Sequence, residues 1–332
     1  MPLDNDSAEV TLDDPASRTL DLTASARALA VKAAPNSIIV ILAVGATWLI
    51  WGSTFLAIRY AVETIPPLYA AGIRHLLAGS FMLACCAAKK LRPTRQQLRE
   101  SIILGFFFFV GGHGLIHWAE VWVPSGASAL LIATEPILVF LLADLVDRKW
   151  RMNAWLASGV IVGLIGVALL LSKAESSGPH MRTGAIAVLL SALSWSIGVV
   201  YSRRSKLSGN PLLVAALAPL SGSFMLLIVA TFAGEARGFS LASVTSRSWL
   251  SLAYLIVFGS IITFTAYAWL LEHFSPTLVA THTYINPVIA VLLGWLVGDG
   301  KVTLNLAIAA ALVISAVFLV QRGTALLGRS SS

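Results

Sequence analysis

The sequence has too little charge for a soluble domain. Asp, Glu, Lys and Arg together make up 12% of its 332 residues, whereas hydrophobic residues make up 57%. Soluble globular domains carry about 25% charged residues, so about half of the expected charge is missing. A soluble core of this size does not use so much apolar surface. The composition therefore indicates an integral membrane protein.

Several other features are scarce or missing. Only two cysteines occur, Cys85 and Cys86, and adjacent cysteines rarely pair, so we expect no disulfide framework and a packing role for both. Residues 1–36 are acidic and lack the basic start and apolar run of a signal peptide. We expect them to form a disordered cytoplasmic tail. No G-x-x-x-x-G-K-[ST] run is present, and the loops are short, so ATP binding is not indicated.

Apolar runs are abundant. Each is long enough to cross a hydrocarbon core of about 30 Å as a helix, and a lone span in lipid must satisfy its own backbone hydrogen bonds. The pattern predicts an all-α integral membrane protein with ten transmembrane helices, at about 38–61, 68–88, 101–122, 126–146, 153–172, 184–202, 211–233, 249–271, 276–297 and 303–321.

The Lys and Arg residues predict the orientation. If the N-terminus is cytoplasmic, the cytoplasmic segments hold 16 of them and the opposite side holds 5. Cytoplasmic loops of membrane proteins carry such an excess, so we expect both termini in the cytoplasm. The basic run at 89–99 is then an orientation signal, and no nucleic-acid binding is needed to explain it.

Two stretches, 118–143 and 269–294, echo each other. Trp118 and Trp269 lie 151 residues apart, and so do Pro136 and Pro287. Five helices per half is an odd number, so the second half enters the membrane upside down relative to the first, as in many secondary transporters. We therefore expect two inverted-topology five-helix repeats. The predicted division is a tail at 1–36, repeats at 37–173 and 182–322, and a cytoplasmic tail at 323–332.

Four stretches carry a resemblance to a known family. They are IWGSTFLAIRYAVETIPPLYAAGIRHLLAG at 50–79, AEVWVPSGASALLIATEP at 119–136, VFGSIITFTAY at 257–267 and SPTLVATHTYINPVIAVLLG at 275–294. Together they resemble the EamA family of the drug/metabolite transporter superfamily, and within it the YedA-like branch. The resemblance covers nearly all of residues 38–321. It implies ten helices, two EamA repeats and a small-molecule permease of the inner membrane, often an exporter, without implying a substrate.

Ionisable residues inside the predicted spans are the first functional candidates, because each costs about 3 kcal/mol or more unless paired or hydrated. Arg59 lies near the outer end of the first span, where it either reaches the interface or acts in transport. Arg74 lies about 10 Å below the surface, so we expect a partner, with Glu120 the candidate. Such a pair is either a structural staple or a substrate-handling group. Arg59, Arg74 and Glu120 match the family pattern.

His113, His117 and Glu120 follow an i, i+4, i+7 spacing, which places them on one side of a helix. Three interpretations stay open. The side chains form a proton-coupled or substrate-binding face, or they hydrogen-bond neighbouring helices, or the two histidines bind a metal. No third metal ligand is secure, and the two histidines do not match the family pattern.

Glu135 and Pro136 interrupt an apolar run near mid-span. Proline removes one backbone hydrogen bond and frees the carbonyl of Ile132. Glu135 departs from the family pattern and is a proton site, an amine-recognition site or a protonated residue bonded to a neighbour. We expect Trp51 to form an aromatic wall of a central cavity, with three further polar candidates in the second half, Tyr267, Tyr284 and Asn286. Shifted by 151 residues, Glu120 meets Leu271 and Glu135 meets Asn286, so the ionisable chemistry is expected in the first copy.

The sequence thus predicts a secondary active transporter, a permease of the exporter type, for small organic metabolites such as amino acids or their analogues, working by alternating access. The expected partners are a small-molecule solute, membrane lipid and a coupling proton, with no nucleic acid, cofactor or metal, and the chain a monomer or homodimer. Two alternatives remain. One is an intramembrane metal-dependent enzyme using His113 and His117. The other is a carrier of phosphorylated or nucleotide-linked sugars, with Arg59 and Arg74 as its basic pocket.

Overall fold

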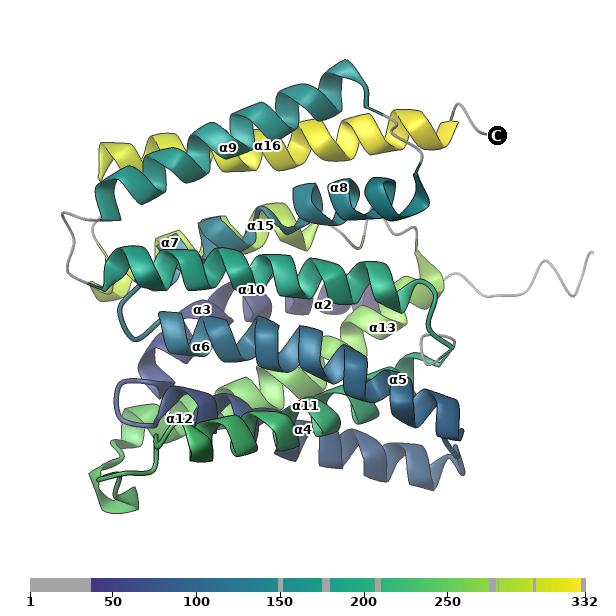
Figure 1. The fold of residues 1–332 in the computed structure, drawn as a ribbon, viewed down its shortest axis with the longest axis vertical. Helices are drawn as coiled ribbons and strands as arrows, with labels where there is room; N and C mark the ends of the chain where they lie inside the picture. The colour runs from purple at the N-terminus through teal and green to yellow at the C-terminus, as the bar shows by residue number, and fades with distance from the viewer. Residues whose placement is uncertain are drawn as a thin grey trace, which may run out of the picture. The chain divides into compact units, whose positions relative to one another are not determined.

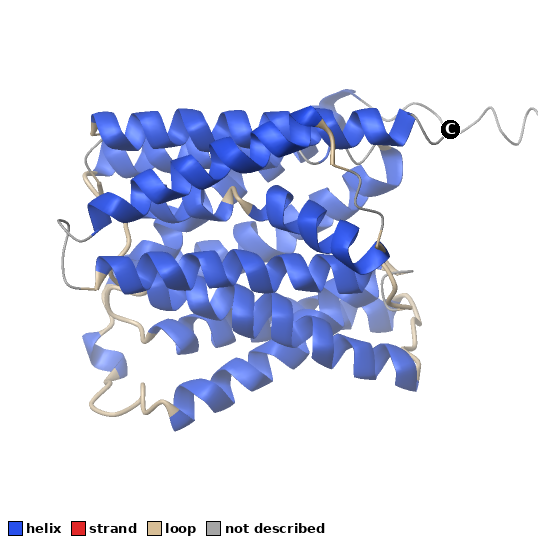
Figure 2. Ribbon diagram, turned by 45° about the horizontal axis from the view of Figure 1, so that its top comes forward, coloured by secondary structure: helices blue, strands red, loops and turns tan. Residues whose placement is uncertain are grey.

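The computed structural model describes residues 37–148, 152–174, 180–206, 210–274, 279, 281–300 and 303–329. The predicted tail at 1–36 lies outside the described residues. The chain divides into two compact units, 1–40 and 41–332, and the arrangement below is that of the second unit. All regular structure in the described ranges is helical (Figure 2), which confirms the predicted all-α class.

The first four spans contain nine α- and π-helical segments. In the labels of Figure 1 they are α2 (Ser37–Gly45), η1 (Ala46–Ile50) and α3 (Trp51–Ala61); α4 (Pro67–Ala88); α5 (Arg95–Gly105), η2 (Phe106–Gly114) and α6 (Leu115–Ala119); α7 (Ser125–Ile132) and α8 (Glu135–Asp147). The fifth span adds α9 (Ala154–Ala174).

Each of the remaining spans is one helix in the described residues, apart from the eighth. They are α10 (Met181–Ser202), α11 (Pro211–Phe232), the eighth span of α12 (Ser246–Tyr254), η6 (Leu255–Ile262) and α13 (Thr263–His273), then α15 (His282–Val297) and α16 (Leu304–Arg329). A single 3₁₀ turn, η5 (Leu241–Ser243), lies in the loop before α12.

Within the described residues, nine helical stretches are long and apolar enough to cross a membrane, and α15 is a shorter apolar helix. Together they account for the ten predicted helices. Two boundaries differ from the prediction. The third span begins at Arg95, not at 101, because Thr94 and Gln97 form a capping box that starts the helix. The last helix continues to Arg329, beyond the predicted end at 321.

The helices pack in a regular pattern. The second span, α4, lies along the seventh, α11, and the fifth, α9, lies along the tenth, α16 (Figure 1). The first span contacts the eighth and ninth through α3, α12 and α15, and the sixth span, α10, contacts the third and fourth. The contacts have a two-fold pattern. If each span is replaced by the one five spans away in the chain, the same pairs of spans are in contact.

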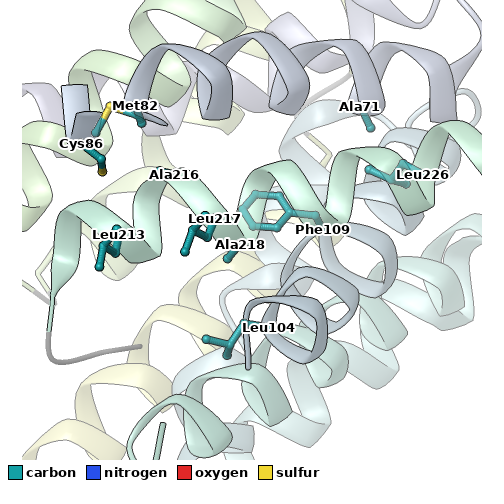
Figure 3. Close-up of a cluster of buried hydrophobic side chains, with 10 residues drawn as sticks. All are labelled: Ala71, Met82, Cys86, Leu104, Phe109, Leu213, Ala216, Leu217, Ala218 and Leu226. Atoms are coloured by element: carbon teal, nitrogen blue, oxygen red, sulfur yellow. The ribbon is translucent and has the colours of Figure 1, made fainter. Parts of the chain in front are cut away.

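The α4–α11 contact holds a cluster of buried apolar side chains. Figure 3 shows residues of these two helices meeting Leu104 of α5 and Phe109 of η2. Small residues also bring the backbones of α5 and α11 close together. A Cβ at Gly105 of α5 would lie 2.7 Å from the backbone nitrogen of Gly222 in α11. Such close approach is typical of helix contacts in membranes, where no hydrophobic effect drives helices together.

Three spans contain a π-helical segment, η1, η2 and η6. A π-helix bonds residue i to i+5, so the turn holds an extra residue and the carbonyl pattern of the α-helix is locally broken. The second and third segments lie in the third and eighth spans. When 151 is added to the residue numbers of η2, its range overlaps that of η6, so the two segments occupy corresponding places in the two halves of the chain. Such segments occur often at functional sites.

The fourth span is interrupted at mid-length. Helix α7 ends at Ile132 and α8 begins at Glu135. The hydroxyl of Thr134 donates to the carbonyl of Leu131 at 2.7 Å, and Pro136 has no N–H to offer the carbonyl of Ile132. The predicted disturbance at Pro136 is therefore confirmed, and it divides the helix in two.

Candidate functional site

Side chains from neighbouring spans bind the carbonyls of the π segments. The indole of Trp51 donates to the carbonyl of Gly259 in η6 at 3.1 Å. With its amide nitrogen turned toward acceptors, Asn286 of α15 donates to the carbonyls of Thr47 and Trp48 in η1, at 3.2 and 3.1 Å. Both contacts join the first span to the second half of the chain. They also give the carbonyls of Gly259, Thr47 and Trp48 hydrogen-bond donors from another helix.

The third span is bound in the same way by α10. The hydroxyl of Ser191 donates to the carbonyl of Gly112 at 2.8 Å, and that of Ser194 donates to the carbonyl of Phe107 at 2.8 Å. Since Gly112 and Phe107 both lie in η2, all three π segments use carbonyls as acceptors for side chains. The irregular backbone is thereby fixed in position.

Three aromatic rings gather around Trp51. Its ring centroid lies 4.9 Å from that of His282, 5.2 Å from Tyr267 and 5.5 Å from Phe264. Tyr267 and His282 are 5.8 Å apart. We call Trp51, Phe264, Tyr267 and His282 the central cluster. All four are half-buried, and they come from α3, α13 and α15, so both halves of the chain contribute.

Glu135 interacts electrostatically with one member of the central cluster. It is the first residue of α8, directly after the interruption, and its carboxyl acts electrostatically on the phenol of Tyr267. The side chain is half-buried. Its backbone carbonyl accepts from Ser196 at 3.4 Å, whereas its carboxyl has no hydrogen bond or ion pair within the described ranges. A carboxyl in this setting binds either a proton or a cation.

A second polar group, a histidine row, lies on η2 and α6. Nδ1 of His113 lies 2.5 Å from Nε2 of His75 on α4, and Nδ1 of His117 lies 2.6 Å from the carbonyl oxygen of His113. His113 also stacks on Trp195, with centroids 5.3 Å apart. The Nε2 of His117 is buried without a hydrogen-bond partner among the described residues. The structure thus brings His113 and His117 together and adds His75.

Arg74 and Glu120 do not form the predicted ion pair. Arg74, which is 3% exposed, donates from Nε to the hydroxyl of Ser260 in η6 at 3.0 Å. Glu120 is fully buried in the turn after α6, and neither carboxyl oxygen has a hydrogen-bond partner in the described part of the chain. Ser260 of η6 is thus the hydrogen-bond partner of the Arg74 Nε, and Glu120 acts on Arg74 only through its charge. The two charges still interact at longer range.

Arg59 bridges the two halves of the chain. Its Nε lies 3.1 Å from Oδ1 of Asp299, and its Nη1 donates to the carbonyls of Glu120 and Val121 at 2.6 and 2.7 Å. Oδ2 of Asp299 accepts from the backbone nitrogen and the hydroxyl of Ser125, at 2.8 and 2.6 Å. We call this the Arg59–Asp299 bridge. The ion pair and the carbonyl bonds give Arg59 specific partners in both halves of the chain.

A cavity of about 270 Å³ lies beside this bridge, lined by Arg59, Tyr60, Glu63, Arg247, Val297, Gly298 and Asp299. On its rim, Nη2 of Arg247 lies 2.6 Å from the carboxylate of Glu63. The cavity is therefore bordered by charges of both signs at the end of the bundle where α3 ends and α4 begins.

Tyr284 stands apart from the other candidates. It packs against a small apolar cluster of Ala133, Val313 and Val317, which lies between the interruption of the fourth span and α16. The structure therefore does not bring Tyr284 to the central cluster. Within the ranges that the structure describes, no group of three or more His, Cys, Asp or Glu side chains is arranged to hold a metal ion.

Sequence reasoning missed several residues of these groups. Phe264 and His282 of the central cluster lie in the stretches that carried the family resemblance, but nothing in their spacing marks them as neighbours of Trp51. His75 follows Arg74 directly, and that adjacency was its only signal. Asp299 lies just beyond the apolar run of α15, 240 residues from Arg59, so no local pattern indicated the bridge.

Apolar spans interrupted at mid-length, arranged around half-buried polar and aromatic side chains, define a multi-pass membrane protein of the transporter class. The chain belongs to the EamA-like transporter family, whose model matches residues 37–172 and 182–322. The resemblance drawn from the sequence is thereby confirmed. The chain is a membrane transporter of this family.

Similar proteins agree with this assignment. The chain is 36% identical over 282 residues to the "Uncharacterized inner membrane transporter YedA" of Escherichia coli (strain K12), covering 84% of this chain and 89% of the relative. It is 26% identical over 288 residues to the "Uncharacterized transporter YoaV" of Bacillus subtilis (strain 168), covering 84% and 96%. A solved crystal structure aligns with a TM-score of 0.60 at 22% identity, over 88% of this chain and 98% of that one, which supports the fold alone.

Proposed function

We propose that the chain is a secondary active transporter that exports small organic metabolites, such as amino acids or their analogues, by alternating access. The observation that carries the proposal is the central cluster. It is built from α3 of the first half and from α13 and α15 of the second, and the carboxyl of Glu135, in the interrupted fourth span, acts electrostatically on its Tyr267. A site between two halves, beside an interrupted helix, is the usual place for substrate in secondary transporters.

The proposal includes two inverted repeats, 37–173 and 182–322. The exchange symmetry of the helix contacts supports it, as do the overlapping positions of η2 and η6 and the two separate matches to the family model. An odd number of spans per half inverts the second copy. The Lys and Arg distribution favours a cytoplasmic location for both termini in the cell inner membrane.

In this orientation the Arg59–Asp299 bridge lies at the outer end. Arg59 belongs to the first half and Asp299 to the second, so the halves cannot separate there while the ion pair and its hydrogen bonds are intact. The Arg59–Asp299 bridge supports the proposal that the arrangement is a state closed at the outer end. Export requires this bridge to open. Coupling to protons through Glu120 or Glu135 is the proposed source of energy, because both are carboxyls inside the spans that form no ion pair among the described residues.

The two alternative functions gain no specific support. A metal-dependent enzyme needs a third ligand beside His113 and His117, and the nearest imidazole, His75, is hydrogen-bonded to His113 itself. A carrier for sugar phosphates needs a basic pocket, but Arg59 is engaged by Asp299 and two carbonyls. Neither is proposed.

Two assays test the proposed function. The first expresses the chain in a transporter-depleted host and screens amino acids and toxic analogues for resistance. The second measures movement of the responding solutes into everted vesicles under an imposed proton gradient. We expect at least one solute to be moved against its gradient, and Glu120→Gln to abolish the proton dependence. Asp147→Asn, on the exposed inner surface, is the matched control. Absence of gradient-driven movement for every solute overturns the proposal.

A further inference from the structure

We propose that the cavity beside the Arg59–Asp299 bridge binds a small zwitterion, a molecule that carries a carboxylate and an ammonium group. Arg59, in its wall, lies about 12 Å along α3 from Trp51 of the central cluster, so this ligand site is separate from the proposed substrate position. Residues of both halves of the chain line the cavity. A zwitterion bound there holds the two halves together at this end, a role beyond the proposed transport function.

Charge selects the class of ligand. The first half of the chain supplies Arg59 and Glu63 to the cavity, and the second half supplies Asp299 and Arg247. Each half therefore presents, among its described residues, one charge of each sign. A simple anion in the cavity is repelled by two carboxylates, and a simple cation is repelled by two guanidinium groups. A ligand that carries both charges is complementary to these four side chains.

The Arg247–Glu63 pair is the part of the wall that a ligand can replace. Its one hydrogen bond joins Nη2 of Arg247 to Oε2 of Glu63, and Nε and Nη1 of Arg247 and Oε1 of Glu63 have no such partner in the described part of the chain. The Arg247 side chain is 60% exposed, and exposed ion pairs contribute little to stability. The ligand carboxylate binds the arginine fork with two parallel bonds, and the ligand ammonium group binds the Glu63 carboxylate.

The Arg59–Asp299 bridge is the fixed side of the cavity. Asp299 is nearly buried and also accepts two hydrogen bonds from Ser125. Arg59 uses Nε and Nη1 for its contacts, and within the described ranges its Nη2 forms no hydrogen bond. Nη2 is therefore a further donor for the ligand carboxylate.

Hydrogen bonds hold the replaceable pair in place before a ligand arrives. Ser248, next to Arg247 in α12, is fully buried and donates to the carbonyl of Tyr60 at 2.7 Å. The hydroxyl of Thr64, next to Glu63, donates to Ser248 at 2.8 Å. The guanidinium of Arg247 also lies over the Tyr60 ring, 4.7 Å from its centroid. A site whose parts are already fixed loses less conformational entropy on binding.

The volume limits the size of the ligand. The cavity measures about 270 Å³, whereas pockets for drug-sized ligands measure about 300–1,000 Å³. A small amino acid fits this volume, and a nucleotide or an oligosaccharide does not.

The test uses the purified full chain in detergent and three small probes. Free alanine carries both charges at neutral pH, propionate lacks the ammonium group and ethylamine lacks the carboxylate. Calorimetry measures the binding of each. We expect alanine to bind at least about tenfold more tightly than the other two and to raise the thermal unfolding midpoint, because it binds the folded state. Its affinity should fall as salt is added, since the ion pairs that it forms are partly exposed.

Two variants assign the binding to this cavity. Arg247→Gln and Glu63→Gln should each weaken alanine binding about tenfold or more. Arg237→Gln is the matched control and should bind alanine as wild type does, because it removes an exposed arginine of the loop between α11 and α12 that does not line the cavity. If Arg247→Gln does not fold, Arg247→Lys decides, because it keeps the charge but loses the fork and should also weaken binding.

Three results would overturn the inference: no binding of alanine, equal binding of all three probes, or alanine binding that is unchanged in the Arg247 variants. The transport assay in vesicles separates this site from the proposed function. If no solute moves in vesicles while alanine binds as expected, the proposed function is overturned and the zwitterion site stands. If solutes move while the Arg247 variants bind alanine as wild type does, the transport function stands and the zwitterion site is overturned.

Discussion

The Arg59 guanidinium and the Asp299 carboxylate join the end of α3 to the turn after α15, with Nε and Oδ1 3.1 Å apart. The carboxylate side chain is 6% exposed and the guanidinium 29%. Asp299 also accepts two hydrogen bonds from Ser125, at the start of α7. One acidic residue thus connects three spans.

Replacing Asp299 tests how much this connection stabilises the fold. Asp299→Asn removes the ion pair and leaves Arg59 with its carbonyl acceptors, so we expect a loss of about 1–3 kcal/mol in the free energy of unfolding. Asp147→Asn is the matched control, because it breaks the exposed Arg204–Asp147 pair of 2.8 Å and should cost less than about 1 kcal/mol. Tryptophan fluorescence during unfolding in detergent measures both. Equal losses would show that the Arg59–Asp299 bridge has no special role.

The interruption of the fourth span gives a second prediction. Pro136→Ala restores an N–H that can reach the carbonyl of Ile132, so α7 and α8 can join into one helix. We expect thermal stability to be kept or raised while transport falls, since Glu135 would turn away from Tyr267. The equivalent change in the second half, Pro287→Ala, acts inside the continuous helix α15 and should alter transport less. Full transport by Pro136→Ala would contradict a role for the interruption.

Helix packing gives a third prediction. A Cβ at Gly105 would lie 2.7 Å from the nitrogen of Gly222 and 3.0 Å from the carbonyl oxygen of Ala218. Because these atoms are backbone, the helices must move apart, and Gly105→Ala should cost about 1–3 kcal/mol. At Gly45 nothing lies within 4 Å of the added atom, so Gly45→Ala should be neutral or slightly stabilising. Thermal unfolding in detergent distinguishes the two, and equal midpoints would contradict the close contact.

The loop after α11 gives a prediction for pH. Glu235 accepts hydrogen bonds from the backbone nitrogens of Leu68 and Tyr69, at 3.0 and 3.3 Å, at the start of α4. Burial raises the pKa of this carboxyl above its usual value, and the two N–H donors offset part of the increase. A raised pKa of an acid means that its contribution to stability is fully present below the ordinary value and is lost as the pH rises through the folded value.

We therefore expect the wild-type unfolding midpoint to fall as the pH rises from about 4 toward neutrality. Glu235→Gln, which keeps an oxygen acceptor but does not titrate, should remove part of this slope. Glu63→Gln, in the loop before α4, serves as control because its carboxylate pairs with Arg247. An identical slope in wild type and Glu235→Gln would contradict the assignment.

The sequence predicted the spans well and the contacts between them poorly. Apolar runs set by bilayer thickness locate helices without reference to neighbours, and Glu135 was identifiable because a carboxyl beside Pro136 is unusual in such a run. The π segments were not predicted, since their extra residue is held by donors from other helices, such as Ser194 on the carbonyl of Phe107. The hydrogen bond from Arg74 to Ser260 was not predicted for a related reason: Ser260 lies 186 residues away, and sequence spacing carries no information at that range.

The π segments also affect how sequences of this family should be compared. Each inserts one residue into a span without lengthening the loops at its ends. A relative that lacks η2 would keep the capping box at Thr94 and the turn at Glu120 in place, and would be one residue shorter between them. Single-residue gaps in the middle of the first, third and eighth spans are then correct alignments, and moving them into loops would misplace Trp51, His113 and Tyr267 by about 100° around their helix axes.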